Sequence, residues 1–208
     1  MGSSGCGKTT LLRMVNRMVD PDSGRVLIDG VDVASMDAVA LRRSIGYVMQ
    51  ETGLLPHKSV LANVVLVARI SGQSREDALR NAEEMLDLVG IAPEQFNRYP
   101  AELSGGQQQR VGVARALAVK PDILLMDEPF GAVDPIVREE LQSELLRIQQ
   151  ALGLTILFVT HDRDEAMRLS HQLVILTQGA HIEQRGEPKQ IAAHPANTFV
   201  KKLSGLGP

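Results

Sequence analysis

The hydrophobic and polar positions of the chain predict short buried strands that alternate with amphipathic helices. Residues 123–126 and 155–159 are apolar runs of strand length. Apolar residues at helical spacing predict a helix over 137–152, between these two runs. Strands and helices that alternate in this way favour an α/β fold with a mainly parallel core sheet.

Turn residues delimit further elements on both sides of this core. Near the start, a helix follows a glycine-rich loop, with Leu11, Leu12, Val15 and Met18 at helical spacing. The other predicted elements are a strand over 25–28 closed by the hairpin turn Asp29-Gly30, a strand over 45–49 that ends at Gln50, a short helix over 165–169, a hairpin of 173–176 and 181–183 around Gly179, and a helix over 188–202 interrupted near Pro195.

Between Gln50 and about residue 120 the pattern becomes mostly helical. The clearest amphipathic helix covers 74–89, Tyr99-Pro100 interrupts the pattern, and another helix follows over 107–119. We therefore expect a single domain over 1–208, in which a helical subdomain of about 51–120 is inserted into an α/β core formed by 1–50 and 121–208.

The composition excludes several classes of protein. The 208 residues include 22 lysines and arginines and 25 aspartates and glutamates, and a net charge of −3 is too balanced for a protein that coats nucleic acid or an anionic membrane. A hydrophobic content of 44% excludes a disordered chain. With Cys6 as the one cysteine no internal disulfide can form, as is usual in a reducing cytosol. The apolar stretch 60–70 is too short for a membrane helix, and no secretory signal is visible.

The first residues carry the pattern of a phosphate-binding loop, Gly2-x-x-x-x-Gly7-Lys8-Thr9. Glycines let successive backbone N–H groups turn inward around an anion, and the following helix adds its positive N-terminal end. Lys8 can contact the β- and γ-phosphates of a nucleotide, and the Thr9 hydroxyl can bind Mg²⁺. A chance glycine turn before a helix is the alternative. We interpret Cys6 as a small residue in a variable position rather than a redox group.

Asp127 and Glu128 directly follow the apolar run 123–126, and ligands bind at the carboxyl ends of strands in open α/β sheets. Asp127 can hold Mg²⁺ through its water, and Glu128 can polarise an attacking water. Two solvated acids after a core strand are the alternative. Gln50 ends another predicted strand and can reach Mg²⁺ or the water when the helical insertion rotates inward, whereas an ordinary strand-end amide is its alternative.

His161 follows the predicted strand 155–159, so its imidazole is expected near the same crevice, where it can bond the γ-phosphate. A capping histidine before Asp162 is the alternative. The remaining histidines show no metal-ligand spacing and are expected at the surface: His57, His171, His181 and His194.

Ser104 is a good helix N-cap, and capping alone is one interpretation of the segment that it opens. The glycines at 105 and 106 lower helix stability, however. They favour a second anion site, where the phosphate of another molecule approaches the backbone closely.

Taken together and in this order, these motifs resemble the ATP-binding cassette (ABC) family of transporter ATPases, over essentially all 208 residues. The loop from Gly2 to Thr9 resembles the Walker A motif, and residues 123–128 resemble Walker B with its catalytic glutamate. Gln50 resembles the Q-loop glutamine and His161 the switch histidine. The signature motif is matched by Leu103-Ser104-Gly105-Gly106-Gln107, and the D-loop by Gly131-Ala132-Val133-Asp134, with Val133 where leucine is usual.

The resemblance implies a P-loop NTPase fold, ATP and Mg²⁺ as ligands, and an ATPase that is active as a head-to-tail dimer. The implied catalytic residues are Glu128, His161 and Gln50, and the implied Mg²⁺ ligands are Thr9, Gln50 and Asp127. The implied nucleotide-binding residues are Gly2, Ser3, Ser4, Gly5, Cys6, Gly7, Lys8, Thr9, Thr10, Gln50, Ser104, Gly105, Gly106, Gln107 and Asp134, of which the signature residues act in trans on the second ATPase subunit.

The resemblance also implies partners at the cytoplasmic face of a membrane, where the protein is peripheral. Integral membrane permease subunits would contact the segment 51–64, a solute-binding protein would act indirectly, and no nucleic acid takes part. Residues 42–50 and 130–135 are similar to those of importer ATPases for quaternary-amine osmoprotectants such as glycine betaine, choline and carnitine. Importer ATPases for amino acids and other polar solutes share many of these residues.

Two departures from the family pattern bear on function. The chain ends at Pro208 without the C-terminal regulatory module of many osmoprotectant ATPases. The family carries a strand and an adenine-stacking aromatic before the phosphate loop, where this chain has only Met1. We therefore expect an N-terminally truncated fold, with Met1 as an internal methionine of a longer chain or the product of a truncated gene. A nucleic-acid-associated ABC ATPase and a defective cassette without ATPase activity are the alternative functions.

Overall fold

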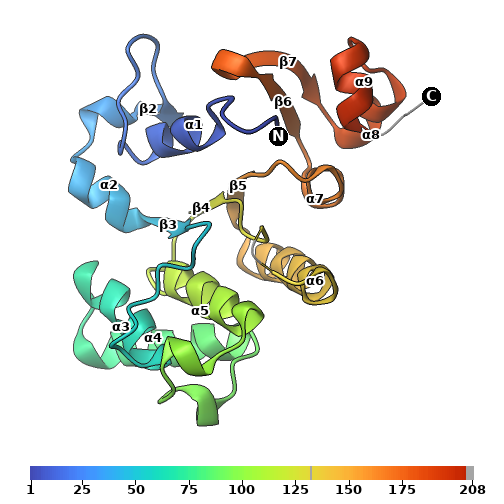
Figure 1. Ribbon diagram of the computed structural model, residues 1–208. Helices are drawn as coiled ribbons and strands as arrows, with labels where there is room; N and C mark the ends of the chain where they lie inside the picture. Colours follow the sequence, from blue (N-terminus) through green and yellow to red (C-terminus); the bar gives the residue numbers. More distant parts are fainter. Residues whose placement is uncertain (132, 205–208) are drawn as a thin grey trace. The chain divides into compact units, whose positions relative to one another are not determined.

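The computed structural model describes residues 1–131 and 133–204 (Figure 1). These residues form two compact units. Met1–Arg13 belong with the chain from Val159 onward to the smaller unit, and Met14–Phe158 form the larger one. Strands and helices alternate along the larger unit, in agreement with the predicted α/β fold.

The central sheet contains strands β3 (Ile45–Val48), β4 (Ile123–Asp127) and β5 (Thr155–Val159), in the order β3-β4-β5. β3 and β4 are parallel and pair in register from Ile45 with Ile123 to Val48 with Met126. The side chains of residues 124–126 are fully buried, because a parallel strand is covered on both faces. The parallel pairing brings the carboxyl ends of β3 and β4 side by side.

Strand β5 is less buried than the apolar run 155–159 predicted. Val159 is buried, but Thr155 and Leu157 are exposed, and 44% of Leu157 is accessible to solvent. Among the described residues β5 stands at the end of the strand order and has β4 as its neighbour. A strand that is covered on one face shows this alternation of exposed and covered side chains.

Three helices of the larger unit pack against one another: α3 (Val60–Ile70), α4 (Arg75–Leu88) and α5 (Gly105–Leu117). α5 also packs against β3, and this contact attaches the helices to the sheet. In the part of the chain that the structure describes, no helix is both long and apolar enough to cross a membrane.

Serine caps fix where these three helices begin. The hydroxyls of Ser59, Ser74 and Ser104 each accept a backbone N–H from the first helical turn. The short 3₁₀ turns η2 (Pro93–Gln95) and η3 (Pro100–Glu102) separate α4 from α5, where the sequence predicted an interruption. The predicted helices over 74–89 and 107–119 therefore exist, the second beginning two residues early.

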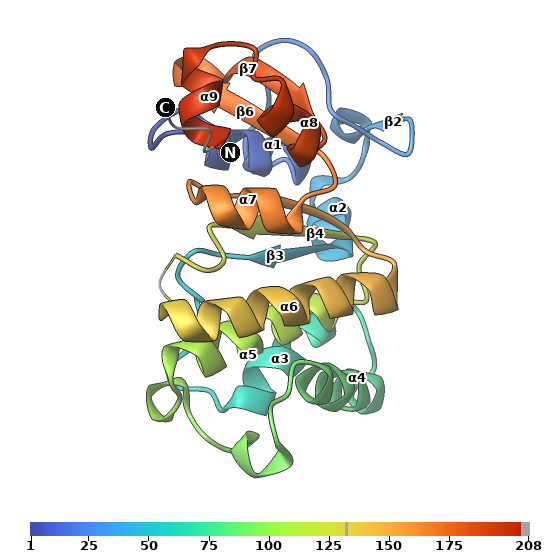
Figure 2. The same cartoon turned by 90° about the vertical axis from the view of Figure 1, so that its right-hand side faces the viewer.

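Helix α6 (Pro135–Leu152) packs against α5 in the larger unit (Figure 2). Asp134 caps its N-terminus, and Gly153 ends it in the left-handed conformation with φ of 65°. Leu141, Leu145 and Ile148 are buried at the helical spacing that predicted this helix.

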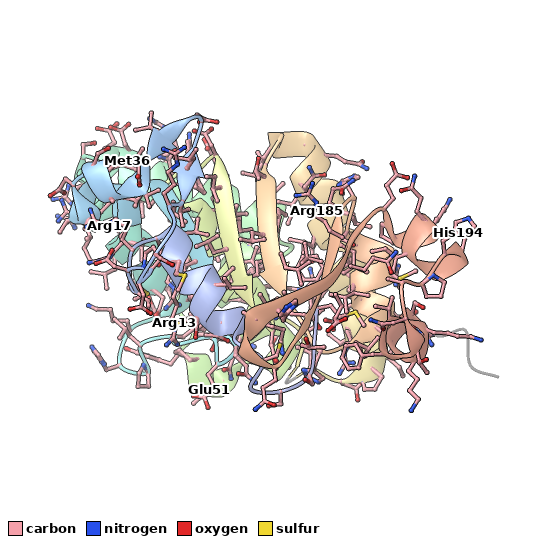
Figure 3. All side chains as sticks on the ribbon, turned by 90° about the horizontal axis from the view of Figure 1, so that it is seen from above. Arg13, Arg17, Met36, Glu51, Arg185 and His194 are labelled. Carbon is pink, nitrogen blue, oxygen red and sulfur yellow. The ribbon has the colours of Figure 1, made fainter. Side chains whose placement is uncertain are left out.

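A hairpin precedes the sheet, as predicted from Asp29-Gly30. Strands β1 (Leu27–Ile28) and β2 (Val31–Asp32) are antiparallel, and Asp29 and Gly30 both have positive φ, of 50° and 81°. The 3₁₀ turn η1 (Val33–Ser35) and helix α2 (Ala38–Ser44) lead from the hairpin to β3. Arg17 donates from Nη1 to the Met36 carbonyl at 2.7 Å and so holds this connection (Figure 3).

Helix α1 (Lys8–Val15) is shorter than the sequence predicted. Leu12 is buried as expected, but Met18 lies beyond the helix end and is 59% exposed. The helix stops because Arg17 has φ of 55°, and the Asn16 side chain accepts the Met18 N–H at 3.2 Å. Leu11 is also 40% exposed, so only part of the expected apolar stripe is buried.

The smaller unit contains an antiparallel hairpin of β6 (Leu173–Thr177) and β7 (His181–Gly186), joined by η4 (Gln178–Ala180), in which Gly179 has φ of 74°. Helices α7 (Arg163–Leu169), α8 (Pro188–Ala193) and α9 (Thr198–Ser204) pack together in this unit. The gap between α8 and α9 contains Pro195, as predicted. The core holds Met1, Ala166, Leu173, Ile175, Ile191 and Val200.

The first two residues of the chain lie beside β6. The Leu176 N–H donates to the Met1 carbonyl at 2.9 Å, and Gly2 pairs with Leu176 as a parallel bridge. A Cβ atom at Gly2 would lie 2.4 Å from the Leu176 carbonyl oxygen, so this approach requires glycine. The phosphate-binding loop thus starts from the side of β6.

Candidate functional site

The phosphate-binding loop takes its shape from glycines in conformations that other residues rarely adopt. Gly5 and Gly7 have φ of 75° and 100°. The Ala180 N–H donates to the Cys6 carbonyl at 2.8 Å and ties the loop to η4. Cys6 is 1% exposed, as expected of a small packing residue. Since α1 begins at Lys8, the N–H groups of its first turn directly follow the loop.

Lys8 places its charge inside this loop. Its side chain is buried, and Nζ donates to the carbonyls of Gly2 at 2.9 Å and Ser3 at 3.0 Å. The backbone N–H groups, the ammonium group and the helix N-terminus therefore belong to one short segment. These are the groups that bind phosphate in proteins, so the loop fits the triphosphate of a nucleotide.

Gln50 and Glu128 come together at the carboxyl ends of β3 and β4. Gln50 Nε2 donates to Glu128 Oε2 at 3.3 Å. Asp127, the last residue of β4, is only 7% exposed. The parallel register of the two strands produces this meeting, which their separation in sequence does not reveal. A carboxylate beside an amide can accept a proton from a water that the amide orients.

Glu128 has a strained backbone conformation, with φ of 45°. A left-handed conformation at a residue other than glycine costs roughly 1–3 kcal/mol and is concentrated at functional sites. The turn continues with a hydrogen bond of 3.1 Å from the Gly131 N–H to the Glu128 carbonyl. The fold therefore holds the Glu128 backbone at the end of β4 in a conformation that costs free energy.

Ser104 opens α5 with a capping box. Its hydroxyl accepts the Gln107 N–H at 3.3 Å, and Gln107 Oε1 accepts the Ser104 N–H at 3.0 Å. Gly106 is buried, and a Cβ atom there would lie 2.6 Å from Val137 Cγ1 on α6. Packing against α6 therefore already requires glycine at 106, without the phosphate approach that the sequence suggested, while Gly105 is exposed.

Asp134 begins α6, and its carboxylate accepts the Ile136 N–H at 3.0 Å. Ile136, in the first turn of α6, is 78% exposed. Ala132 of the predicted D-loop lies outside the described residues.

His161 directly follows β5 and is exposed, and Asp162 rather than His161 caps α7. The capping role considered for this histidine is therefore wrong. The other histidines are exposed, as expected: His57, His171, His181 and His194, the last of which is labelled in Figure 3.

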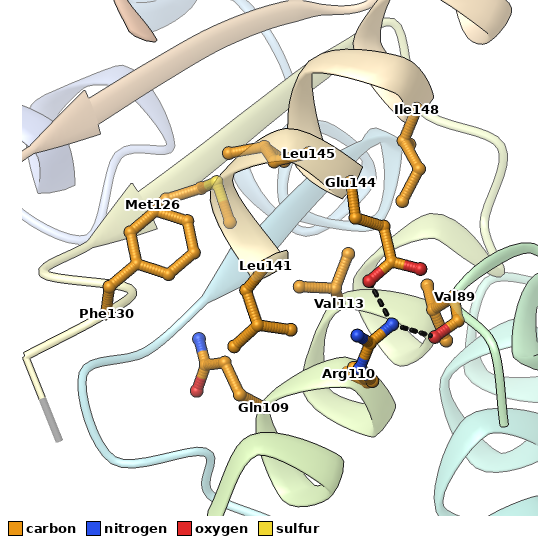
Figure 4. Close-up of a pocket in the computed structure, with 10 residues that line it drawn as sticks. All are labelled: Val89, Gln109, Arg110, Val113, Met126, Phe130, Leu141, Glu144, Leu145 and Ile148. Carbon is orange, nitrogen blue, oxygen red and sulfur yellow. Dashed lines mark hydrogen bonds and ion pairs between the residues drawn. The ribbon is translucent and has the colours of Figure 1, made fainter. Parts of the chain in front are cut away.

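Arg110 and Glu144, which the sequence pattern did not single out, connect three helices of the larger unit (Figure 4). Arg110 on α5 pairs with Glu144 on α6 and donates to the Val89 carbonyl, which ends α4, at 2.9 Å. Burial raises the pKa of Glu144, although Arg110 and Arg147 lower it.

A small cavity lies beside this ion pair. Gln109 is 3% exposed, and its Nε2 has no hydrogen-bond partner within the described protein. The cavity, of about 20 Å³, also touches Met126 and Phe130 (Figure 4). This volume suits one water molecule, so we interpret the cavity as a packing detail.

A larger cavity of about 390 Å³ is lined by residues of α2, β3, α3 and α5. Arg42, Arg43 and Arg115 line it among apolar side chains. Arg115 also donates to the carbonyls of Thr52 at 2.6 Å and Gly53 at 2.7 Å. These bonds attach the segment 51–64 to the wall of an open, positively charged groove.

The predicted site residues thus divide between the two units. The phosphate-binding residues 2–10 and His161 belong to the smaller unit. Gln50, Asp127, Glu128, Asp134 and the signature residues belong to the larger unit. The Thr9 hydroxyl, the Gln50 amide oxygen and the Asp127 carboxylate are oxygen donors, which is the chemistry that Mg²⁺ prefers.

Comparison with known proteins finds that the chain is similar to transport ATP-binding proteins. A family model described as ABC transporter matches residues 1–131. The chain is 51% identical over 205 residues to the glycine betaine/carnitine/choline transport ATP-binding protein OpuCA of Bacillus subtilis. It is 48% identical over 206 residues to the osmoprotectant import ATP-binding protein OsmV of Salmonella typhimurium. Each alignment covers 99% of this chain and 54% of the relative, so the chain spans about half the length of these curated relatives.

Solved structures of similar fold are cassettes of the same kind. The ATP-binding cassette MJ0796, solved as a dimer bound to ADP and Pi, has a TM-score of 0.79 and 34% identity, covering 90% of this chain and 83% of that one. CbiO1 of Clostridium perfringens, part of the ABC transporter complex cbiONQ, has a TM-score of 0.85 and 28% identity, covering 99% and 84%. The fold is therefore that of a P-loop NTPase with a mainly parallel core sheet.

Proposed function

Because this chain belongs to the ABC transporter family, we propose that it binds and hydrolyses ATP as the ATPase subunit of an importer. The observation that carries the proposal is the contact of 3.3 Å between Gln50 and Glu128 at the carboxyl ends of two core strands. Glu128 acts as general base and Gln50 orients the attacking water. General-base assistance contributes on the order of 10²–10⁴-fold to a rate.

The phosphate-binding loop holds the nucleotide in this proposal. Residues 2–10 bind the triphosphate through backbone N–H groups, Lys8 adds a positive charge, and α1 contributes its N-terminus. Mg²⁺, when bound, neutralises charge on the phosphates, and the residues that would hold it are Thr9, Gln50 and Asp127. His161 bonds the γ-phosphate.

The active form is a head-to-tail dimer with a second ATPase subunit. The dimeric state of the similar cassette MJ0796 supports this. Ser104, Gly105, Gly106 and Gln107 would then bind the nucleotide held by the other subunit, with Asp134 beside them. We further propose a single cassette over 1–208, with 51–120 as its inserted helical subdomain.

Integral membrane permease subunits are the proposed partners on the cytoplasmic face of a membrane, with a solute-binding protein acting indirectly. The groove lined by Arg42, Arg43 and Arg115, to which the segment 51–64 is attached, is a suitable surface for them. The solute is a quaternary-amine osmoprotectant. The names of relatives such as OpuCA and OsmV support this choice, because those proteins are named for such transport.

ATP hydrolysis by the purified 208-residue chain with Mg²⁺ tests the first part of the proposal. We expect phosphate release that rises more than linearly with protein concentration, because the dimer is the active form. Absence of hydrolysis at every concentration, with the fold intact by circular dichroism, would contradict it.

Solute choice is tested in vesicles that contain the chain and the permease with which it copurifies. We expect ATP-dependent uptake of labelled glycine betaine, choline or carnitine. Uptake of an amino acid such as histidine in their place would replace the proposed solute class and leave the ATPase assignment intact.

A further inference from the structure

Three hydrogen bonds join the residues on either side of His161 in the smaller unit, and we call them the Thr160–Glu165 ring. Thr160 Oγ1 donates to Glu165 Oε2 at 2.7 Å and accepts the Asp162 N–H at 2.9 Å. Asp162 Oδ1 accepts the Glu165 N–H at 3.0 Å and closes the ring. His161 therefore lies between two residues whose positions the ring fixes.

The residues of the segment 160–165 differ sharply in solvent exposure. Thr160 and Glu165 are each 3% exposed, whereas His161 between them along the chain is exposed. A buried carboxylate is unfavourable unless hydrogen bonds stabilise it, and the bond from the Thr160 hydroxyl contributes to this stabilisation. The buried hydrogen bond between Thr160 and Glu165 therefore joins the residues on either side of an exposed histidine.

Helix capping alone does not account for the ring. The bond from the Glu165 N–H to Asp162 is already the N-cap of α7. The bond between Thr160 and the Glu165 side chain adds nothing to that cap. It connects the residue after β5 to the first turn of α7, across His161.

We propose that Thr160 and Glu165 are positioning residues that hold His161 for ATP hydrolysis, an inference that rests on the function proposed above. The ring fixes the backbone of residues 160–162, so the imidazole is presented in one orientation. Loss of either ring bond would leave the imidazole in place but free to move. Misplacement of a reacting group by about 1 Å can lower a rate on the order of 100-fold.

Two matched pairs of variants test the ring. Thr160→Val removes the hydroxyl at nearly constant shape, and Thr160→Ser keeps it. Glu165→Met removes the acceptor, and Glu165→Gln keeps an oxygen that can accept from Thr160. We expect kcat to fall about tenfold in Thr160→Val and Glu165→Met, with KM for ATP changed less than about twofold. The conservative partners should stay within about threefold of the wild type.

The decisive measurement repeats Thr160→Val and Glu165→Met in a His161→Ala background. If both residues act through His161, neither should lower kcat further once the imidazole is gone. A full loss of about tenfold in that background would overturn the proposal, because the residues would then act independently of His161.

A second readout does not depend on hydrolysis. Hydrogen exchange at the Asp162 amide, which donates to Thr160 Oγ1, should accelerate in Thr160→Val and not in Thr160→Ser. Unchanged exchange in Thr160→Val would also overturn the proposal. Leu169→Ala, at a buried position of α7 outside the ring, is the control for general weakening of the helix and should leave kcat unchanged.

These experiments separate the two levels of inference. A wild-type chain that does not hydrolyse ATP would remove the proposed function, and the positioning role with it. Hydrolysis that depends on His161 but shows no coupling to Thr160 or Glu165 would overturn the positioning role alone.

Discussion

The phosphate-binding loop and the end of β4 both contain backbone at positive φ, but different types of residue adopt it in the two regions. Each needs backbone at positive φ, and the loop assigns it to Gly5 and Gly7, with φ of 75° and 100°. At the end of β4 it falls on Glu128, with φ of 45°. In the proposed function the loop binds phosphate through its N–H groups, and glycine adopts positive φ there without strain. The strand end needs a carboxylate, so strain is retained there.

The comparison teaches that side-chain substitutions should act differently in the two regions. Changes in the loop should alter nucleotide affinity, since we propose that the loop binds the nucleotide. Isosteric changes at the strand end should alter the rate, since chemistry there depends on one ionisable group.

The largest effect is expected for Glu128→Gln. The amide keeps the shape of the side chain and its contact with Gln50, but it cannot accept a proton from water. We expect kcat to fall on the order of 10²–10⁴-fold, with ATP affinity retained. Steady-state hydrolysis and calorimetry measure the two quantities. Glu139→Gln, at an exposed position of α6, is the control, and wild-type turnover in Glu128→Gln would show that Glu128 is not the base.

Lys8→Ala should have the next largest effect, and on binding. Lys8 is buried with its ammonium group on the loop carbonyls of Gly2 and Ser3. Loss of a charge-assisted bond of about 1.5–3 kcal/mol predicts an ATP affinity roughly 10- to 150-fold weaker. Calorimetric titration with Mg·ATP measures it, and Lys189→Ala, an exposed lysine, controls for loss of charge. Equal affinity in Lys8→Ala and the control would exclude the loop as the binding site.

Gly106→Ala should lower the stability of the fold. A Cβ atom there would lie 2.6 Å from Val137 Cγ1, and valine is stiff at χ1, so overpacking should reduce the free energy of unfolding by about 1–3 kcal/mol. Urea denaturation measures this change. The double variant Gly106→Ala with Val137→Ala should recover most of the loss. Failure of this rescue would mean that glycine is needed at 106 for another reason.

The smallest effect concerns the pH dependence at Glu144, whose pKa burial raises against the influence of Arg110 and Arg147. A carboxyl whose folded pKa is raised stabilises the fold fully below its unfolded value, near 4.5, and this contribution is lost as the pH rises through the raised value. Relative to Glu144→Gln, the wild type should therefore lose unfolding free energy as the pH rises above about 4.5.

Urea denaturation across a pH series measures this difference. Glu140→Gln, at an exposed position of the same helix, should show no such trend. A difference that grows with pH would mean that the ion pair with Arg110 outweighs burial.

Much of the fold could be predicted because local signals and tertiary packing agree. The amphipathic run that begins at Ser74 predicted α4. Asp29-Gly30 and Gly179 predicted the two hairpins. The length of α1 could not be predicted, because its end depends on the left-handed conformation of Arg17 rather than on the apolar spacing that continued to Met18.

The site was predictable to the extent that motifs place residues at strand ends. The meeting of Gln50 with Glu128 follows from parallel strands, which the pattern did suggest. The ion pair of Arg110 with Glu144 and the reason for Gly106 depend on how α5 packs against α6. The bond from the Thr160 hydroxyl to Glu165 could not be predicted from the sequence, because it depends on the three-dimensional structure.

The conformation of Glu128 has a consequence for anyone who re-engineers this chain. Substitution by glycine would relieve roughly 1–3 kcal/mol of backbone strain, so an optimisation scored on thermal tolerance alone would favour Glu128→Gly over the natural residue. The variant would be more stable but would lack the proposed catalytic base. Position 128 should therefore not be varied when the chain is optimised for stability. Enrichment of glycine at this position would indicate that the variants are no longer selected for ATP hydrolysis.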